Sequence, residues 1–390
     1  MPKAVKEKVN APQGPVYRFI ASATELNETV QRLKEAERIA CDIEADSMYH
    51  YQEKVCLIQI ASSSEVFIID PLPIQEPKVF RRLFSTPAPK KIFHGADYDV
   101  RSLYRDYSVE MDGLFDTQIA ARFIGIQETS LESLLKRFFD LKLDKRFQKK
   151  DWSRRPLPEE MIAYAAEDVA HLLPLAELLE AKLSDLGRLS WVEEECEILS
   201  GVRPAEDNGS PLFLRFKGAG RLRPRGLAVL EALLQYRKQV AKAKDRPFFK
   251  TFSNSSMLEL AKTRPRTLKK LWSSGILSER QIQMYGTDLV EAIERAVNQP
   301  EEDLPVYPRK KPHSMHPSVP KRIRALRIWR DRRAQQLDLD PSILLTKSLM
   351  TAVALLNPEK ASDLKQITEM RCWQRKEFGN DIVSVLKKDR

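Results

Sequence analysis

Cysteine is scarce in this sequence, and the cysteines that do occur are widely spaced. The 390 residues contain four of them, and no two form a C-x-x-C pair. This spacing supports neither a disulfide framework nor a zinc site, so we expect reduced intracellular thiols. They are Cys41, Cys56, Cys196 and Cys372.

Long apolar runs are also missing. No stretch reaches the roughly 20 apolar residues of a transmembrane helix, and no apolar segment follows the polar start at residues 1–8, so we expect no secretory signal. These absences predict a cytoplasmic protein without a membrane partner. Hydrophobic residues make up 42% of the chain and charged residues 31%, which fits a globular protein of two or three domains.

The net charge of +10 is unevenly distributed. Residues 1–200 hold 27 Lys and Arg against 34 Asp and Glu, whereas residues 201–390 hold 38 against 21, so the two parts carry −7 and +17. A basic region of this size favours a polyanionic partner, most often nucleic acid, although it can also be a solubilising surface.

The first half alternates strand and helix patterns. Apolar runs at residues 54–61 and 65–70 are separated only by three serines, which predicts an antiparallel hairpin, and the strand at 38–46 precedes them. With helices expected near 76–85 and 97–107, the pattern predicts an α/β domain whose mixed sheet is flanked by helices.

The strand at 38–46 carries an acidic pair. Ile39, Cys41 and Ile43 alternate with polar residues, so Asp42 and Glu44 should project together from the other face. Two adjacent carboxylates repel each other unless a cation neutralises them. Alone, the D-x-E pattern is also typical of a solvated strand edge. Asp46 has the same parity, and we interpret it as a surface residue or one that supports the acidic pair from behind.

Further acids follow two other elements. In His94-Gly95-Ala96-Asp97-Tyr98-Asp99 a strand ends at glycine and a helix begins, which places Asp99 in the first turn, with Asp97 a candidate helix cap. A helix is predicted at 158–183, where Tyr164 and Asp168 are one turn apart and share a face. Pro174 should kink this helix because proline lacks the amide hydrogen. Asp116 is predicted to cap the helix that follows it.

Asp42, Glu44, Asp99 and Asp168 could converge on two divalent ions. An oxygen-only ligand set suits Mg²⁺ or Mn²⁺ and not Zn²⁺. Two such ions support in-line displacement at phosphorus. Tyr164 would lie near the attacking water, and a phenol with a pKa of about 10 orients water better than it removes a proton.

The second half contains an internal repeat at an offset of 93 residues. Tyr236-Arg237 returns as Trp329-Arg330, and Tyr285-Gly286-x-Asp288 returns as Phe378-Gly379-x-Asp381. The predicted organisation is a tail at 1–16, an α/β domain at 17–200, a linker at 201–221, a helical domain at 222–297, a proline-rich hinge at 298–319 with the basic cluster Arg309-Lys310-Lys311, and a second copy at 320–390. Candidate nucleic-acid contacts lie in the basic runs 215–225, 262–270 and 321–333, above all Arg215, Lys217, Arg221, Arg223, Arg225, Lys321 and Arg322.

These motifs resemble, in order and surroundings, the DEDD 3′→5′ exonucleases of the tyrosine subtype, and the chain over 17–390 is similar to the bacterial ribonuclease D family. The resemblance implies a ribonuclease H-like exonuclease domain followed by two small all-α HRDC (helicase and RNase D C-terminal) domains. It also implies that Asp42, Glu44, Asp99 and Asp168 bind the metals and that Tyr164 positions the water. Ile43 departs from the family, which usually has threonine between the two acids. We expect its side chain to point away from the metals.

The resemblance implies a 3′→5′ exoribonuclease that trims RNA with a free 3′ end, precursor tRNA included, and releases nucleoside 5′-monophosphates with two Mg²⁺ or Mn²⁺ ions. The basic HRDC pair would hold RNA, and no obligate protein partner is evident. Two alternatives stay open at this point. One is a catalytically inactive nucleic-acid-binding protein, which the presence of all five expected residues disfavours. The other is an exonuclease acting on single-stranded DNA, since no readable motif reports a contact to the 2′-hydroxyl.

Overall fold

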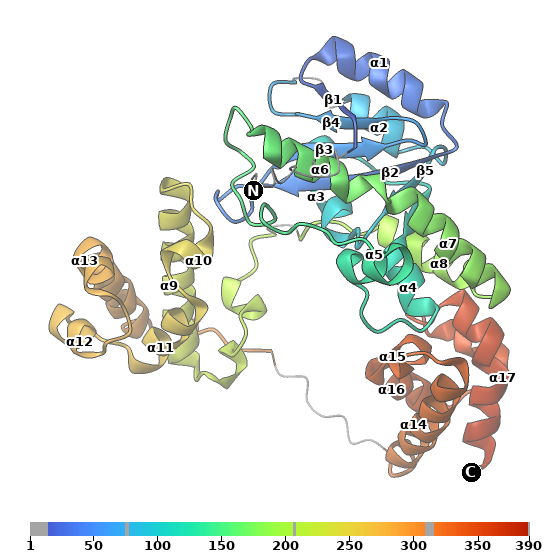
Figure 1. Cartoon of the computed structure of the whole chain (residues 1–390). Helices are drawn as coiled ribbons and strands as arrows, with labels where there is room; N and C mark the ends of the chain where they lie inside the picture. The colour runs from blue at the N-terminus through green and yellow to red at the C-terminus, as the bar shows by residue number, and fades with distance from the viewer. Residues whose placement is uncertain (1–14, 75–77, 206–207, 309–315, 389–390) are drawn as a thin grey trace, which may run out of the picture. The chain divides into compact units, whose positions relative to one another are not determined.

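A computed structural model of the chain describes residues 15–74, 78–205, 208–308 and 316–388. Most of the predicted tail and the cluster Arg309-Lys310-Lys311 lie outside these ranges. The chain forms two compact units: one from Met1–Ala45, Val55–Pro204 and Ser314–Arg390, the other from Asp46–Lys54 and Ala205–His313 (Figure 1). None of the described helices combines the length and apolar composition needed to span a bilayer.

The first unit is built on a six-stranded mixed sheet in the order β1-β4-β3-β2-β5-β6. The predicted hairpin and mixed sheet are confirmed: β2–β3 and β3–β4 pair antiparallel, and the remaining neighbours pair parallel. Strand β2 is therefore central, which rules out the solvated-edge interpretation of the acidic pair. The strands are β1 (Tyr17–Ile20), β2 (Arg38–Ala45), β3 (Val55–Ala61), β4 (Val66–Ile69), β5 (Lys90–Phe93) and β6 (Leu114–Asp116).

Among the described residues, eight helices between residues 23 and 200 surround this sheet. Helix α6 contacts strands β2, β3 and β4, and α7 contacts β2 and β5 (Figure 1). Most of the buried apolar side chains form one large core, while a smaller core that includes Trp152 and Tyr164 lies between the sheet and α6. The helices are α1 (Ala23–Lys34), α2 (Lys78–Phe84), α3 (Asp97–Tyr107), α4 (Thr117–Phe123), α5 (Leu131–Phe139), α6 (Glu159–Ala170), α7 (Leu172–Asp185) and α8 (Leu189–Ser200).

The long helix predicted at 158–183 is two helices. The break lies at His171, between α6 and α7, and Pro174 sits in the first turn of α7. A proline ring clashes with the carbonyl four residues earlier and cannot donate to it, so the interruption falls one turn before the proline itself. The prediction of a single kinked helix was therefore wrong, although its physical cause was the right one.

The second helical copy belongs to the same unit as the sheet. Its helices are α14 (Ser318–Leu337), α15 (Pro341–Leu344), α16 (Lys347–Leu356) and α17 (Cys372–Lys388), with the short 3₁₀ helix η4 (Ala361–Gln366). The Trp373 ring stacks on Trp191 of α8 with ring centroids 4.6 Å apart, and Phe123 packs edge-on against Trp373. Buried side chains of this copy are continuous with the core of the α/β part.

The second unit contains the first helical copy. Its helices are α9 (Pro224–Ala243), α10 (Phe248–Thr251), α11 (Asn254–Thr263), α12 (Leu268–Ser273) and α13 (Glu279–Val297), and 3₁₀ helices η1 (Leu212–Arg215), η2 (Ala219–Arg221) and η3 (Glu301–Asp303) flank them. Phe213, within the predicted linker, is buried in the core of this copy.

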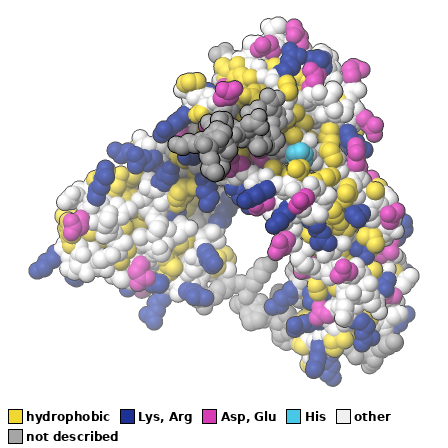
Figure 2. Space-filling view, in the orientation of Figure 1, with side chains coloured by type: hydrophobic (Ala, Val, Ile, Leu, Met, Phe, Trp, Pro, Cys, Tyr) yellow, Lys and Arg dark blue, Asp and Glu magenta, His cyan; other side chains and the backbone are white. Residues whose placement is uncertain are grey.

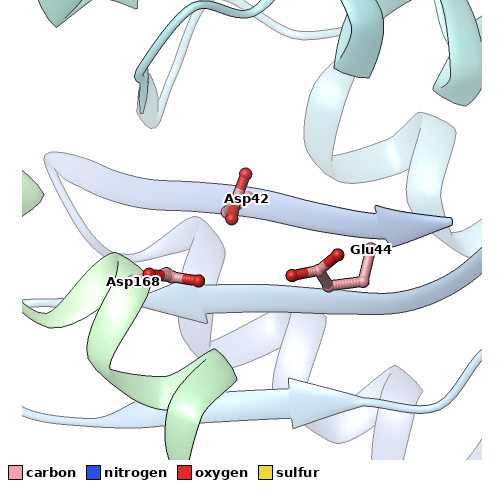
Figure 3. A group of neighbouring side chains, drawn as sticks. All are labelled: Asp42, Glu44 and Asp168. Atoms are coloured by element: carbon pink, nitrogen blue, oxygen red, sulfur yellow. The ribbon is translucent and has the colours of Figure 1, made fainter. Parts of the chain in front are cut away.

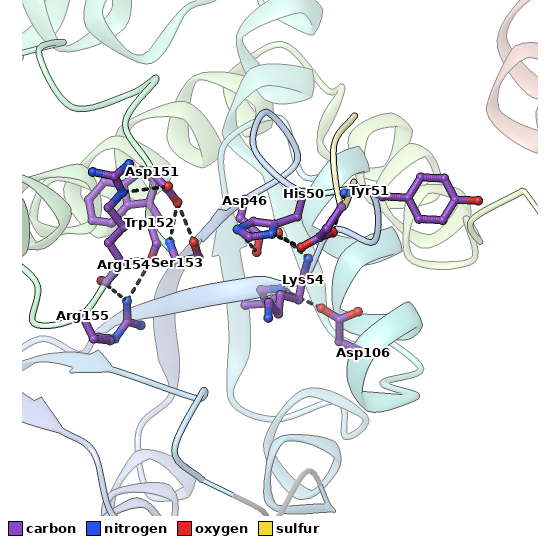
Figure 4. A network of polar contacts seen from close by, with 12 residues as sticks. Asp46, His50, Tyr51, Lys54, Asp106, Asp151, Trp152, Ser153, Arg154 and Arg155 are labelled. Carbon is purple, nitrogen blue, oxygen red and sulfur yellow. Dashed lines mark hydrogen bonds and ion pairs between the residues drawn. The ribbon is translucent and has the colours of Figure 1, made fainter. Parts of the chain in front are cut away.

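Residues 46–54 complete the second unit, and their polar contacts are drawn in Figure 4. Asp46 accepts a hydrogen bond from the Lys54 amide at 2.7 Å, and His50 Nδ1 lies 2.6 Å from Asp245 Oδ2. The side chain of Asp46 is fully buried. The surface alternative for Asp46 was therefore wrong, because the turn after β2 needs a buried acceptor for its amide groups.

Candidate metal-dependent active site

Three carboxylates from two elements meet at the middle of the sheet. Asp42 and Glu44 project from β2, and Asp168 projects from α6, which crosses that face (Figure 3). One ligand atom of each lies within 4.8 Å of the others. Period-2 alternation on β2 brings the first two together, and the packing of α6 on the sheet adds the third.

Asp99 enters the same site from the first turn of α3. It is buried, and the charge of Asp42 is among the causes that raise its pKa, but Asp99 is not one of the three acids that meet within 4.8 Å. The tight turn before α3 is held by Asp116, whose carboxylate accepts hydrogen bonds from the amides of Gly95 at 3.1 Å and Ala96 at 2.7 Å. Gly95 has φ +75°, a conformation that favours glycine.

Asp116 has two structural roles. Its carboxylate caps α4, as predicted, by accepting from the amides of Gln118 and Ile119. The same group orients the start of α3, a role that the sequence pattern did not indicate. By contrast, Asp97 is not a cap: it occupies the first helical position and pairs with Arg101 at 2.8 Å. The alternative of Asp97 as a helix cap was wrong, because Ala96 takes the cap position.

Burial raises the pKa of all four carboxyl groups. Desolvation is the main cause in each case, and it raises the pKa of Asp42 to about 7 and that of Asp168 to about 8. The pKa values of Glu44 and Asp99 are also raised well above the ordinary range by desolvation, and then by the neighbouring acids. Four acids in one buried site disfavour their ionised forms unless a cation is present.

Tyr164 lies one turn before Asp168 and hydrogen-bonds to it. Burial, followed by the charges of Asp168, Glu44 and Asp42, raises the pKa of this phenol far above neutrality. Its ring packs between Phe147 and Trp152, with ring centroids 5.7 Å and 6.2 Å away. These two aromatic residues fix the tyrosine ring, and they were missed because no local pattern connects them with α6.

Asp42, Glu44 and Asp168 line a cavity of about 370 Å³. The cavity wall also includes polar groups that the sequence reasoning did not assign to the site: His94, Gln118, Glu132, Lys145 and Gln148. The His94 Nδ1 atom lies 2.9 Å from the Thr117 hydroxyl, and its Nε2 atom is buried without a hydrogen-bond partner. The H-G-A-x-x-D motif contained His94, but nothing in the sequence indicated that this residue would line the cavity.

The ligand chemistry of the site fits hard divalent cations. Every group in the Asp42, Glu44 and Asp168 cluster offers oxygen, and Asp99 adds another carboxylate next to Asp42. Oxygen donors of this type bind Mg²⁺ or Mn²⁺ in preference to zinc. The buried, mutually repelling acids therefore form a site that a divalent metal would stabilise.

The basic candidates lie in both helical copies. Lys217, Arg221, Arg223 and Lys321 have exposed side chains. Two others donate to backbone carbonyls: Arg225 to that of Gln299, just after the first copy, and Arg322 to that of Ala354 at 3.2 Å. Arg215 is exposed and has interactions within the protein. These positions leave nucleic-acid contacts possible at the exposed residues and make Arg225 and Arg322 weaker candidates.

Comparison with known families identifies both parts of the chain. Residues 17–184 match the model of a 3′-5′ exonuclease family, and residues 226–293 and 320–386 each match the HRDC domain. Residues 17–184 therefore belong to a DEDD 3′→5′ exonuclease domain, and two HRDC domains follow it. The two HRDC matches coincide with the repeat at an offset of 93 residues, which we now call HRDC1 and HRDC2.

Similar proteins include enzymes of the ribonuclease D type. Ribonuclease D from Pseudomonas paraeruginosa is 26% identical over 375 residues, which cover 96% of this chain and 98% of that protein. Protein RRP6-like 2 from Arabidopsis thaliana is 31% identical, but the match covers 65% of this chain and 31% of that longer protein. The crystal structure of Escherichia coli RNase D has the same fold, with a TM-score of 0.74, 23% identity, and coverage of 96% and 99% of the two chains.

Proposed function

We propose that this DEDD exonuclease removes nucleotides one at a time from the 3′ end of RNA, precursor tRNA included, and releases nucleoside 5′-monophosphates. The observation that carries this proposal is the meeting of Asp42, Glu44 and Asp168 within 4.8 Å, beside Tyr164 and in one cavity. RNA as the substrate is supported by the end-to-end similarity to ribonuclease D. We also propose a cytoplasmic location, because all four cysteines are free.

The acids of this chain would hold two Mg²⁺ or Mn²⁺ ions. When bound, such a pair lowers the pKa of water and stabilises the leaving oxygen of an in-line displacement. Asp42 lies on β2, Asp99 in the first turn of α3 and Asp168 on α6. Because each acid comes from a different element or strand position, the fold itself sets the spacing of the ligands.

Tyr164 acts as an orienting group. Its raised pKa keeps the phenol protonated at neutral pH, so its hydroxyl can hold the attacking water by hydrogen bonding but cannot accept the proton as a base. The packing of Phe147 and Trp152 on its ring keeps the hydroxyl directed at the acids. The proposal therefore assigns the positioning of water to the protein and its activation to the cations.

The test uses an RNA labelled at its 5′ end and a DNA of the same sequence, each incubated with the native protein and Mg²⁺ or Mn²⁺. We expect stepwise shortening of the RNA from its 3′ end, which a 3′-phosphate should block. Asp42→Asn should reduce the rate by about 10³-fold or more, since several kcal/mol of charge stabilisation depend on the metals. Tyr164→Phe should reduce it by roughly 10²-fold.

Asp97→Asn is the matched control, because Asp97 lies two residues from Asp99 but is outside the cavity wall and pairs with Arg101. Its rate should stay within roughly twofold of the native rate. If neither RNA nor DNA is shortened under either metal, the enzyme proposal fails and a binding function remains. Faster shortening of the DNA than of the RNA would instead show that single-stranded DNA is the preferred substrate.

A further inference from the structure

HRDC1 exposes a basic surface around a tryptophan, at the end of α11 and along α12. We call it the α12 face. All six of its side chains are exposed to solvent. They are Arg264, Arg266, Leu268, Lys269, Lys270 and Trp272.

The equivalent segments of the two copies differ in charge. Residues 260–278 of HRDC1 contain five Lys and Arg and no acidic residue, whereas residues 353–371 of HRDC2 contain three of each sign. Lys269 and Lys270 correspond to Ser362 and Asp363. Asp363 has a structural use in HRDC2, since it accepts hydrogen bonds from the amides of Glu359 and Lys360 at 3.0 and 3.1 Å. The positive charge is therefore a property of one copy and not of the domain fold.

Trp272 is the exposed tryptophan of this chain. Its side chain is 42% accessible, whereas Trp152, Trp191 and Trp373 are almost completely buried. Leu268, one turn earlier on α12, is 43% accessible and lies on the same side of the helix. At the position of Trp272, HRDC2 has Lys365. Tryptophan is enriched at interfaces, and an exposed ring beside lysines offers a surface on which a ligand can stack.

The stability of the fold does not explain why the α12 face carries basic and aromatic side chains. The positions that fold the segment are kept in both copies: Leu271 and Leu364 are fully buried, and Pro265 and Pro358 are buried as well. At the left-handed residue that ends α11, HRDC1 has Arg264 with φ 50°, where HRDC2 has Asn357 with φ 49°. Asparagine tolerates this conformation better than arginine. The backbone conformation therefore does not explain why HRDC1 has an arginine at this position.

The lysines of the α12 face are available to a ligand. Arg266 lies 3.4 Å from Glu294, so its charge is partly balanced. Neither Lys269 nor Lys270 forms an ion pair within the part of the chain that the structure describes. In the space-filling view, the Lys and Arg side chains on the visible face of this unit outnumber the acidic ones (Figure 2).

We propose that the α12 face binds single-stranded RNA, with one base stacked on Trp272 and phosphates bound by Lys269, Lys270 and Arg264. This inference rests on the proposed function for its ligand, and it assigns the recognition of single strands to HRDC1 alone. Stacking on an aromatic ring tolerates any base, because every base has a π face, and lysines beside it can follow the backbone. Exposed charge and an exposed ring together are the two elements that such binding needs.

The test measures binding without cleavage. The full chain carrying Asp42→Asn is titrated into a fluorescein-labelled single-stranded RNA, and fluorescence anisotropy gives Kd over a series of KCl concentrations. Trp272→Leu should raise Kd by about 5- to 100-fold, and Trp272→Phe, which keeps an aromatic ring, should restore most of the affinity. Replacing Lys269 and Lys270 together by alanine should reduce the slope of log Kd against log [KCl] by about 1.4.

Lys365→Ala in HRDC2 is the matched control, and it should leave Kd unchanged. Circular dichroism and thermal unfolding of each variant would show that the fold is kept, as expected for exposed positions. Unchanged RNA affinity in Trp272→Leu would overturn the inference and would suggest a protein ligand for this surface. A rise in Kd for Lys365→Ala as large as that for Trp272→Leu would also overturn it, because the binding would then not be specific to HRDC1. Failure of the proposed function looks different: RNA would not be shortened, while its binding would still depend on Trp272.

Discussion

The two HRDC copies have the same fold but begin their last helix in different ways. In HRDC1, Ser278 caps α13, and the Gln281 side chain accepts a hydrogen bond from the Ser278 amide at 3.1 Å, which forms a complete capping box. In HRDC2 the equivalent residues are Arg371 and Gln374. Gln374 still accepts from the Arg371 amide at 3.0 Å, but arginine cannot supply the acceptor that serine supplied.

The missing acceptor comes from the exonuclease domain. Glu194 of α8 accepts hydrogen bonds from the amides of Cys372 at 2.6 Å and Trp373 at 2.9 Å. Next to it, Glu195 accepts from Arg371 and from the Trp373 indole. A carboxylate at a helix N-terminus also interacts favourably with the helix dipole. In HRDC2 the cap of the last helix thus comes from α8 and not from the domain itself, so the cap also attaches HRDC2 to the α/β core.

The two copies of one domain therefore have different uses. HRDC2 uses the start of its last helix for docking, and its segment 353–371 carries no excess charge. HRDC1 keeps its own cap and carries the basic α12 face. Three changes test this difference between the copies: at the docking contact, at the metal site and at the cap of α17. The expected changes in stability decrease in that order.

The largest effect is expected at the docking tryptophan. Trp373→Ala removes a side chain that is 4% accessible and stacked on Trp191, so it should destabilise the exonuclease–HRDC2 unit by about 3–5 kcal/mol. Arg280, the equivalent in HRDC1, is exposed, and Arg280→Ala should change stability by about 0.5 kcal/mol or less. Native-state hydrogen exchange, read peptide by peptide, would assign each loss to its unit. Equal losses in both units would contradict the assignment of docking to HRDC2.

A smaller effect is expected from removing divalent metal. The pKa values of Asp42 and Asp168 rise from 3.8 to about 7 and about 8 on folding, so the folded metal-free protein favours their protonated forms. The contribution of these two groups to stability should be fully present below about pH 4 and should be lost as the pH rises through 7 to 8. Because Mg²⁺ binds the ionised acids, its stabilising effect should grow over the same range, reaching about 2.7 kcal/mol at 100 times Kd.

Thermal unfolding with Mg²⁺ or with a chelator, at several pH values, measures this dependence. In hydrogen exchange, Mg²⁺ should protect peptides of β2 and α6 and leave those of HRDC1 unchanged. Asp42→Asn removes one of the buried charges, so it should stabilise the metal-free protein near pH 8 and weaken the response to Mg²⁺. A response to Mg²⁺ that is the same at pH 5 and pH 8 would speak against ionised acids as the ligands.

The parts of the fold that repeat at short range could be predicted from the sequence. Alternation on β2 placed Asp42 beside Glu44, and the spacing of Tyr164 and Asp168 placed them on one helical face. The constant offset of 93 residues revealed the two HRDC copies through matching residues alone. In each case a regular period, and not a distant contact, carried the information.

Contacts between distant elements could not be predicted in this way. Nothing near Asp116 in sequence indicates that it orients α3, and nothing near Arg371 indicates that Glu194 would cap α17. The break at His171 and the burial of Asp46 likewise depend on what packs around them. The family resemblance supplied the roles of the acids, whereas the exposed ring of Trp272 became meaningful only when the accessibility of both copies could be compared.

The smallest effect is expected at the cap that HRDC2 obtains from α8. Glu194→Ala leaves the amides of Cys372 and Trp373 without their acceptor and should cost about 1 kcal/mol, similar to Ser278→Ala at the cap of HRDC1. In the Glu194→Ala protein, Arg371→Ser should recover most of this loss, because Gln374 already provides the other half of a capping box. Urea unfolding of the single and double variants measures the coupling. If Arg371→Ser gives no recovery, the role of Glu194 lies in the docking contact and not in capping, and the two copies would then differ by attachment alone.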